Sequence, residues 1–258
     1  MRIAIIGTGK MGFWLAKKLC DENTVAVYDT DKQKMHGLEE CATVLKELSE
    51  LRSYAPELLI NAVSLQNTVV AFESATPYLP KDCIITDVAS IKECLQQYYN
   101  KCGFNFASVH PMFGPTFADM NSLKEENAII IKESEKSGAE FFRAFFSKLG
   151  IRIFEYTFEE HDQMMAYTLT TPFAASLVFA ACIDKTVVPG TTFARHKKLA
   201  QGLLSEDDNL LAEILFNKYS LNQLAKITSR IEFLKHIISN KDYTEAKRFF
   251  NNLRKNVG

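Results

Sequence analysis

The sequence predicts an α/β protein in which a doubly wound, mostly parallel sheet is followed by an all-helical domain. The first 155 residues alternate short β-branched runs with amphipathic segments, a pattern typical of a parallel sheet covered by helices. A glycine-rich turn follows the first of these runs. From residue 156 onward the pattern is helical and strand signals are few. We therefore expect two domains, residues 1–155 and 156–258.

Composition is that of an ordinary globular protein. The 258 residues are 24% charged and 47% hydrophobic, with a formal net charge of −1. Without a basic excess, we expect no nucleic-acid partner and no attraction to an anionic membrane. No apolar run approaches the roughly 20 residues that span a bilayer. The six cysteines lack metal-binding spacing, so we expect reduced thiols, no bound metal and a cytoplasmic location.

The first element is a strand, Arg2–Ile6, which leads into "GTGKMG" rather than a signal-peptide cleavage site. Gly7, Gly9 and Gly12 fit the GxGxxG pattern of Rossmann-type folds. There the first glycine permits a tight turn, the second lets a pyrophosphate approach the backbone, and the third lets the helix pack closely. The N-terminus of the helix that follows offers N–H groups and the positive end of a dipole. We expect the cofactor to contact Gly7, Thr8, Gly9, Lys10, Met11 and Gly12.

The second strand, Thr24–Tyr28, ends at Asp29, an acid about 20 residues after the glycine turn. A carboxylate here can accept hydrogen bonds from the ribose hydroxyls of NAD and would repel the 2′-phosphate of NADP. No arginine that could bind a 2′-phosphate follows in "DTDKQK", but the cation Lys32 keeps NADP open as an alternative. The alternative for Asp29 is a turn or helix-cap residue. NAD is the expected cofactor.

The remaining strands continue the alternation. Ligands bind at the carboxyl ends of parallel strands. Ser64, Asp87–Ser90 and His110 all follow such ends, so we expect them to share one crevice with the glycine turn, with Ser64 in the cofactor site and Asp87 structural. These strands are expected at Leu58–Val63, Cys83–Thr86, Phe104–Val109, Ala128–Ile131 and Arg152–Phe154.

The second half of the chain is predicted to form a helical dimerisation domain. "FAASLVFAACI" is apolar nearly all round, which is typical of a helix buried in a bundle. A segment of about 100 residues would hardly bury such a helix alone, so an intertwined homodimer is expected. Pro172 should kink its helix.

Three segments, "TDVASIKECL", "VHPMFGP" and "EEHDQMMAYT", resemble in order and spacing the signature segments of prephenate dehydrogenases. The resemblance covers roughly residues 1–180 and weakens beyond them. It implies NAD-dependent oxidative decarboxylation of prephenate to 4-hydroxyphenylpyruvate in tyrosine biosynthesis. Oxidation of the C4 hydroxyl sends a hydride to the nicotinamide and a proton to a base, and loss of carbon dioxide makes the ring aromatic.

The resemblance also implies roles for two side chains. His110 would be the catalytic base or hydrogen-bond acceptor, held by the prolines of its motif, and Ser90 would orient it or bind the same hydroxyl. The alternatives are a satisfied histidine in a turn for His110 and the N-cap of "IKECLQQYY" for Ser90. His161 and Asp162 match the His-Asp pair of the family, which resembles a polar gate or domain-joint contact. They could equally be a capping pair at a helix start.

The chain departs from the family pattern in its second half. Thr170 and Phe173 stand where histidines often stand, and Thr170 remains a candidate substrate contact. The family arginine that binds substrate would fall near Gln201–Leu203, where the chain has none. A dianionic substrate needs a nearby cation. The basic run Arg195, His196, Lys197 and Lys198 could supply it, with Arg195 and Lys198 as the expected substrate contacts, and a solvated basic face is the alternative for this run.

Other functions stay open on this basis. Arogenate has an amino group where prephenate has a keto group and undergoes the same chemistry. Another dehydrogenase with a Rossmann and a helical domain, such as a β-hydroxyacid dehydrogenase or an imine reductase, would normally carry an active-site lysine on its helical domain. A non-catalytic NAD-binding sensor is a third alternative, but such a sensor would need neither His110 nor Ser90.

Overall fold

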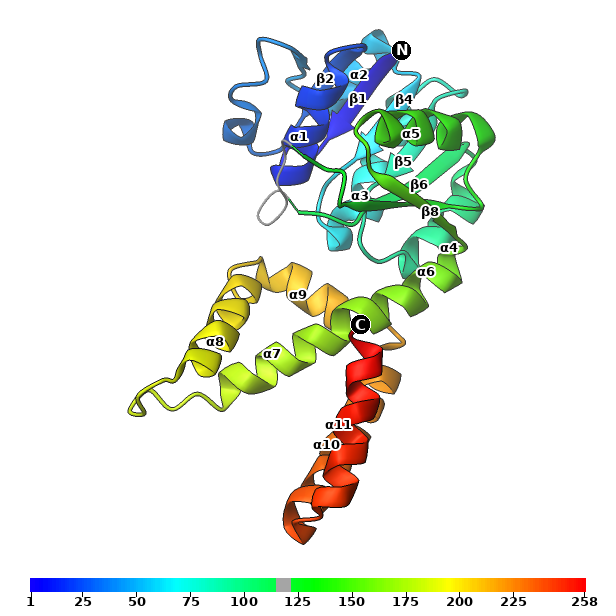
Figure 1. The fold of residues 1–258 in the computed structure, drawn as a ribbon. Helices are drawn as coiled ribbons and strands as arrows, with labels where there is room; N and C mark the ends of the chain where they lie inside the picture. The colour runs from blue at the N-terminus through cyan, green and yellow to red at the C-terminus, as the bar shows by residue number, and fades with distance from the viewer. Residues whose placement is uncertain (115–121) are drawn as a thin grey trace. The chain divides into compact units, whose positions relative to one another are not determined.

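The structure, a computed structural model, describes residues 1–114 and 122–258 (Figure 1). Helix α6 (Phe158–Met165), which lies beyond the boundary predicted at residue 155, groups with the sheet. The reason is Phe158, whose ring centroid lies 6.3 Å from that of Tyr99 and 6.0 Å from that of Phe106. The chain divides into two compact units, the first comprising Met1–Met165 and Asn209–Ile214, the second Ala166–Asp208 and Leu215–Gly258.

Within the described residues, the first unit contains an eight-stranded sheet in the order β3-β2-β1-β4-β5-β6-β7-β8. Every neighbouring pair is parallel except β6 and β7. The predicted doubly wound, mostly parallel sheet is therefore confirmed. The strands are β1 Arg2–Ile6, β2 Thr24–Tyr28, β3 Thr43–Val44, β4 Leu58–Asn61, β5 Ile84–Asp87, β6 Phe106–Pro111, β7 Asn127–Ile131 and β8 Arg152–Tyr156.

The central strands are apolar on both faces, as parallel strands covered by helices must be. In β1, Ile3 and Ile5 join one core cluster with Leu15 of α1 and Phe142 of α5, while Ile6 is buried on the opposite face. On that opposite side, α3 and α4 meet through stacked aromatic rings. These helices are α1 Lys10–Leu19, α3 Leu65–Ala75, α4 Glu93–Cys102 and α5 Lys136–Lys148.

Short elements between β2 and β4 carry no clear sequence signal, and we did not predict them. Strand β3 has only two residues, too few for an alternating pattern to be visible. Short helical turns complete this connection and the one after α3. They are the 3₁₀ turns Lys32–Met35, Leu48–Glu50 and Thr76–Tyr78 and the helix α2 Leu51–Tyr54.

Every regular element among the described residues of the second unit is helical, as predicted. Its first segment is a π-helical turn, Ala166–Thr170, directly before α7. Pro172 stands in the first turn of α7, where its missing N–H is tolerated, and the π turn precedes it. The kink predicted at Pro172 stays a prediction, and the irregularity that the structure has at this place is the π turn. The helices of this unit are α7 Thr171–Ala181, α8 Thr191–Leu203, α10 Ser220–Asn240 and α11 Tyr243–Asn256, whereas nearly all of α9, Asp208–Leu215, belongs to the first unit.

Helix α6, the π turn and α7 form one continuous helix, Phe158–Ala181, of 24 residues. Its most apolar window has a mean hydropathy of 1.4, and only 22% of that window is buried. By length and composition this helix could cross a membrane, so the expectation that no apolar run approaches that length is wrong. Core helices of soluble proteins reach the same length and hydropathy, but they are mostly buried. In this structure most of that window is exposed.

Candidate active site

The glycine turn has the geometry that a dinucleotide requires. Gly7 has φ +86°, and a Cβ there would lie 2.7 Å from the Val63 backbone nitrogen, so only glycine fits. A Cβ on Gly12 would lie 1.9 Å from the Gly7 carbonyl oxygen. Gly9 precedes α1 without a side-chain cap, and a Cβ there would meet no atom within 4 Å. The backbone at Gly9 is thus open to an incoming pyrophosphate, while cofactor contact by the residues of this turn stays a prediction.

Asp29 lies directly beside this turn. Its Oδ2 accepts hydrogen bonds from the Thr8 backbone N–H at 2.7 Å and from the Thr8 hydroxyl at 3.2 Å. Its Oδ1 accepts from the Asp31 N–H at 2.8 Å. The carboxylate therefore stabilises the loop, which was the alternative assignment. Binding of a ribose by Asp29 stays a prediction.

Ser64 stands at the same edge of the sheet, at the N-terminus of α3. Its hydroxyl accepts a hydrogen bond from the Asn67 side-chain amide at 2.9 Å. The preceding residue, Val63, is the one that packs against Gly7. The structure therefore brings Ser64 and the glycine turn together, while cofactor contact by Ser64 remains a prediction.

His110 occupies the end of β6, paired with Ile129 of β7, and is 6% exposed. It lies inside the strand, which continues to Pro111, and not in a turn after it. The segment beyond it is anchored by Phe113, whose ring centroid is 5.3 Å from that of Trp14 in α1. Pro115, the second proline of the motif, lies outside the described residues.

A chain of three buried side chains extends from His110. Its Nδ1 lies 3.0 Å from Nε2 of His161, and Nδ1 of His161 lies 2.9 Å from Oδ1 of Asp162. His161 is 0% and Asp162 2% exposed. Oδ1 of Asp162 also accepts the backbone N–H of Lys92 at 2.9 Å. The sequence singled out His110 and, separately, the pair His161 and Asp162, but gave no sign that His110 and this pair are connected.

The His-Asp pair does not cap its helix. A capping box at the start of α6 is formed by other residues: the Thr157 N–H donates to Glu160 Oε2 at 2.8 Å, and the Glu160 N–H donates to Thr157 Oγ1 at 3.2 Å. His161 and Asp162 follow this box and face inward. The capping alternative for them is therefore wrong.

A buried ion pair lies next to this chain, and the sequence analysis missed it. The Lys92 ammonium donates to the Asp87 carboxylate and, at 2.8 Å, to the Val109 carbonyl oxygen. Oδ1 of Asp87 also accepts the Tyr99 hydroxyl at 2.7 Å. Lys92 and Asp87 are fully buried. A lysine within the mostly apolar stretch "VASIKECL" was the available signal.

Burial controls the charge of both histidines. Desolvation, together with the neighbouring His161 and Lys92, holds the pKa of His110 well below its usual value. Desolvation and Lys92 lower the pKa of His161 to about 3. Both rings are therefore neutral near pH 7, so His110 is able to accept a proton.

These pKa shifts predict a specific loss of stability in acid. Below pH 6.5 the unfolded chain takes up protons that the folded His161 does not bind until about pH 3, so stability falls as pH falls through that window. The slope is about 1.4 kcal/mol per pH unit for each such histidine. Urea unfolding at about pH 7 and about pH 5.5 should give His161→Gln a correspondingly shallower pH dependence. The exposed His36→Gln is the control, and equal slopes in all three proteins would contradict the prediction.

Ser90 lies in the loop between β5 and α4. The helix begins at Glu93 and its N-cap is Lys92, so the N-cap alternative for Ser90 is wrong. In the part of the chain that the structure describes, the Ser90 hydroxyl makes no hydrogen bond, with His110 or any other residue. Hydrogen bonds hold its loop at both ends. The Ala89 N–H donates to Asp87 Oδ2 at 3.0 Å, and the Lys92 backbone N–H donates to Asp162 Oδ1. Its role in orienting His110 or binding substrate stays a prediction.

The substrate contacts predicted in the second half lie in the second unit. The Thr170 hydroxyl is buried and lies 2.7 Å from that of Ser220. Arg195 and Lys198 are exposed on α8. Among the described residues neither of the two forms an ion pair. Their roles in substrate binding therefore remain predictions.

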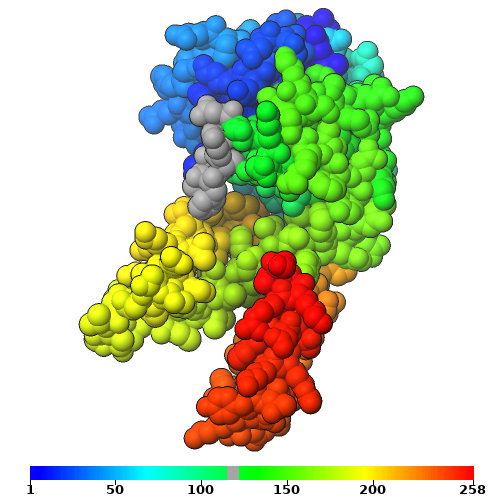
Figure 2. Space-filling view, in the orientation of Figure 1, coloured from blue at the N-terminus to red at the C-terminus, as the bar shows by residue number. Residues whose placement is uncertain are grey.

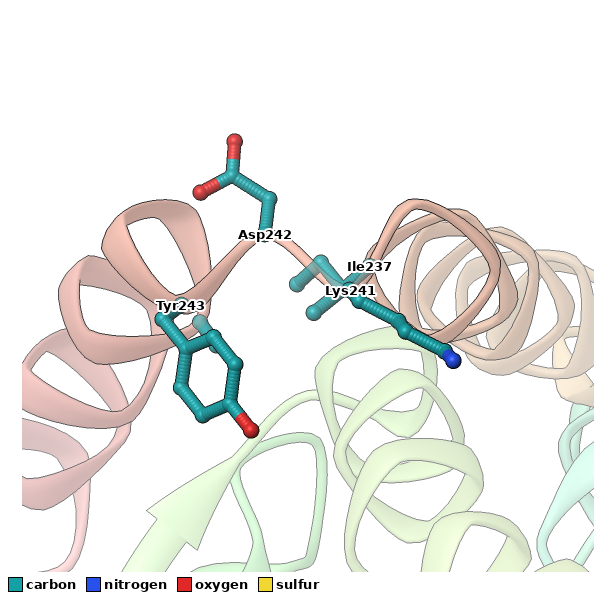
Figure 3. Close-up of a pocket in the computed structure, with 5 residues that line it drawn as sticks. Ile237, Lys241, Asp242 and Tyr243 are labelled. Carbon is teal, nitrogen blue, oxygen red and sulfur yellow. The ribbon is translucent and has the colours of Figure 1, made fainter.

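A separate pocket of about 160 Å³ lies at the turn between α10 and α11 (Figure 3). Asp242 caps α11, accepting the N–H groups of Thr244 and Glu245, each at 2.9 Å, and its carboxylate points away from the Tyr243 ring in Figure 3. The pocket is small for a ligand site. None of its lining residues is a predicted site residue: Ile237, Lys241, Asp242, Tyr243 and Ala246.

Comparison with known proteins identifies similar sequences. The family "Prephenate dehydrogenase, nucleotide-binding domain" matches residues 14–154, more than half of the chain. Arogenate dehydrogenase 1, chloroplastic, of Arabidopsis thaliana is 23% identical over 91% of this chain and 39% of its own length. The T-protein of Enterobacter agglomerans is 25% identical over 87% of this chain and 58% of its own. The chain thus spans less than two thirds of these curated relatives.

Solved structures share the fold over nearly the whole chain. Prephenate dehydrogenase of Aquifex aeolicus, in complex with hydroxyphenyl propionate and NAD+, has a TM-score of 0.84 and 16% identity, covering 99% of this chain and 96% of that one. Arogenate dehydrogenase of Synechocystis has a TM-score of 0.79 and 19% identity, covering 99% and 98%. At these identities the likeness concerns the fold.

Proposed function

Because this chain belongs to the prephenate dehydrogenase family, we propose that it is an NAD-dependent dehydrogenase that converts prephenate to 4-hydroxyphenylpyruvate in tyrosine biosynthesis. The observation that carries the proposal is the buried, neutral His110 at the carboxyl edge of the sheet. A neutral imidazole at this edge suits removal of a proton from a substrate hydroxyl. The NAD+ and hydroxyphenyl propionate bound by the Aquifex aeolicus enzyme support this assignment of cofactor and substrate class.

In the proposed reaction His110 accepts the proton of the C4 hydroxyl as that carbon loses hydride. Bound NAD supplies the hydride acceptor. The ring carboxylate then leaves as carbon dioxide, its bonding electrons complete the aromatic ring, and the resulting phenolate oxygen takes back the proton held by His110 to give the product phenol. Ser90 would hold the same hydroxyl, and the glycine turn would hold the cofactor pyrophosphate. Each protein group therefore binds, orients or accepts a proton, which is the contribution that cofactor chemistry leaves to the chain.

Asp29→Ser is expected to lower the preference for NAD over NADP, measured as the ratio of the two kcat/KM values, by at least about tenfold. The reason is that a carboxylate repels a 2′-phosphate, and like charges in contact cost several kcal/mol. Because Asp29 also stabilises the Thr8 loop, both kcat/KM values should fall in absolute terms. Asp31→Ser, two residues further on, is the control that should leave the ratio unchanged. If Asp29→Ser also leaves the ratio of the two kcat/KM values unchanged, Asp29 stabilises the loop and does not contact the ribose.

Arogenate is the second candidate substrate, supported by the relatives from Arabidopsis thaliana and Synechocystis.

The chain lacks the family arginine, so we propose Arg195, with Lys198, as the cation for a substrate carboxylate. Arg195→Ala should raise KM for the substrate at least about tenfold with little change in kcat. Lys226→Ala, an exposed cation on α10, is the control. An unaltered KM would mean that another cation binds the substrate carboxylate.

We also propose that a second copy of this chain covers the exposed apolar surface of the second unit. In α10 the exposed Leu221, Leu224, Ile231 and Ile238 recur at helical spacing along one face. Figure 2 shows surface of α10 and α11 in orange and red. A dimer would cover this face and α7 together and would suit a cytoplasmic enzyme.

The dimer is tested by light scattering of the purified chain. The expected mass is that of two chains, without detergent, and Leu224→Lys with Ile231→Lys should give monomers or aggregates. Lys226→Gln on the same helix is the control. A monomeric wild-type chain would contradict the dimer, and a chain that dissolves only in detergent would assign the apolar helix to a membrane.

The function itself is tested by following NADH absorbance with purified protein, NAD and either prephenate or arogenate. Turnover of prephenate supports the proposal, and turnover of arogenate alone moves the enzyme to the second candidate. If neither reacts while NAD binds, the proposal fails. Another dehydrogenase reaction or a sensor role then takes its place.

A further inference from the structure

We propose that His161 and Asp162 are positioning residues that fix the tautomer of His110, so that its Nε2 carries a lone pair and accepts the substrate proton. The inference deepens the proposed function, and it rests on that function in assigning the proton acceptor. It follows from the direction that each hydrogen bond in the buried chain must take.

The direction is set at Asp162. An ionised carboxylate only accepts hydrogen bonds, and Oδ1 of Asp162 already accepts the Lys92 backbone N–H. Nδ1 of His161 lies 2.9 Å from the same oxygen, so this nitrogen must carry a proton. A neutral imidazole has one N–H, and the lowered pKa of His161 keeps the ring neutral. Nε2 of His161 is therefore an acceptor.

The same reasoning passes to the second ring. Nδ1 of His110 lies 3.0 Å from Nε2 of His161, and because that nitrogen accepts, Nδ1 of His110 must donate. The single proton of neutral His110 is then on Nδ1, and Nε2 holds the lone pair. All three side chains are at most 6% exposed, so water does not compete for these bonds.

Without Asp162 the hydrogen bond between the two histidines could point in the opposite direction. His161 would then be free to protonate Nε2 and donate to Nδ1 of His110, which would put the His110 proton on Nε2. A protonated Nε2 would meet a substrate hydroxyl donor to donor and could not accept its proton. One carboxylate, two rings away, thus selects the reactive form of the base.

The carboxylate also bears on the charge formed in the reaction. When Nε2 of His110 gains a proton, the ring becomes a cation whose Nδ1–H still donates to His161. Asp162 is the anion at the far end of that chain. The other charged groups that face it are Lys92 and Asp87, which are paired with each other and with the Tyr99 hydroxyl.

The tautomer is measured directly by ¹⁵N NMR of histidine-labelled full-length protein at neutral pH. The expected result is a protonated Nδ1 and an unprotonated Nε2 for both His110 and His161. Asp162→Asn should convert His110 at least in part to the Nε2–H form. Glu159→Gln, on the exposed side of the same helix, should leave both rings unchanged. A wild-type His110 protonated on Nε2 would overturn the inference, and this spectrum decides even if Asp162→Asn fails to fold.

Kinetics provide the second readout. Loss of an aspartate that fixes a histidine tautomer costs up to about 10⁴-fold in kcat in serine proteases, and here we expect at least about tenfold. The KM for substrate and the dissociation constant for NAD should stay within about twofold, because a residue that acts through His110 contributes to the reaction step and not to ligand binding. His161→Gln, which has one donor and one acceptor, should retain more activity than His161→Phe. An unchanged kcat in Asp162→Asn would overturn the positioning role.

The two readouts separate this inference from the proposed function. If the predicted tautomers are found but neither prephenate nor arogenate is oxidised, the proposed function fails and the positioning of His110 stands. If a substrate is oxidised and His110 carries its proton on Nε2, the function stands and the positioning role fails.

Discussion

His110→Asn is expected to lower kcat by at least about a hundredfold, the lower end of the usual contribution of a general base. Asparagine has similar bulk and can still hydrogen-bond to His161, but its amide cannot accept the substrate proton. His110 lies at the edge of the sheet and is not part of the glycine turn, so the dissociation constant for NAD should change by less than about twofold. Steady-state kinetics and a titration with NAD measure the two quantities.

The matched control is His36→Asn. The His36 side chain is 77% exposed and its charged neighbour is Glu39, so kcat should be unaltered. Near-normal turnover of His110→Asn would remove His110 from the chemistry. A parallel loss of NAD binding would mean that the substitution disturbs the sheet edge and not the base alone.

Lys92→Met is expected to lower the free energy of unfolding by about 3–5 kcal/mol, the usual cost of removing one partner of a buried ion pair. Lys92 and Asp87 are both fully buried. Without the ammonium, Asp87 keeps, among the described residues, the Tyr99 hydroxyl and the Ala89 N–H as its side-chain partners, and the Val109 carbonyl loses the Lys92 ammonium. Urea unfolding measured by circular dichroism gives the change.

Two further variants show where the energy resides. Lys92→Met combined with Asp87→Leu removes both charges and should cost less than Lys92→Met alone. Lys132→Met breaks an ion pair with Glu160 whose side chains are 46% and 49% exposed, and should cost far less stability than Lys92→Met, because water screens exposed charges. Equal losses for Lys92→Met and Lys132→Met would show that the buried pair is solvated in the folded protein.

The sheet was predictable because its signals are local. Each parallel strand is a short apolar run, and the predicted runs Arg2–Ile6 and Thr24–Tyr28 coincide with β1 and β2. Boundaries near prolines were harder. A proline usually ends a strand, but Pro111 is tolerated because Met112 supplies the next N–H, donated to Asn127.

The connections within the site were not predictable, because they join residues far apart in the sequence. His110 and His161 are 51 residues apart, and Lys92 and Asp162 are 70 apart. Each residue could be recognised by its motif, but no periodicity reports which side chains meet once the chain folds. Burial of Lys92 was not predictable for the same reason, because a lysine is expected at the surface unless a buried partner for its charge is known.

The π turn at Ala166–Thr170 has a consequence for how the chain tolerates insertions and deletions. A π turn holds one residue more than a turn of α-helix, and each residue of an α-helix rotates the next by about 100°. Because the wider turn absorbs the extra residue, deleting Leu169 would allow regular α geometry from Phe158 to Ala181 and leave the later side chains of that helix close to their present phase. The Thr170 hydroxyl would then stay near Ser220, to which it now hydrogen-bonds. The helix should therefore tolerate the loss of one residue here, whereas the same loss within α7 would rotate every later side chain of α7 by about 100°.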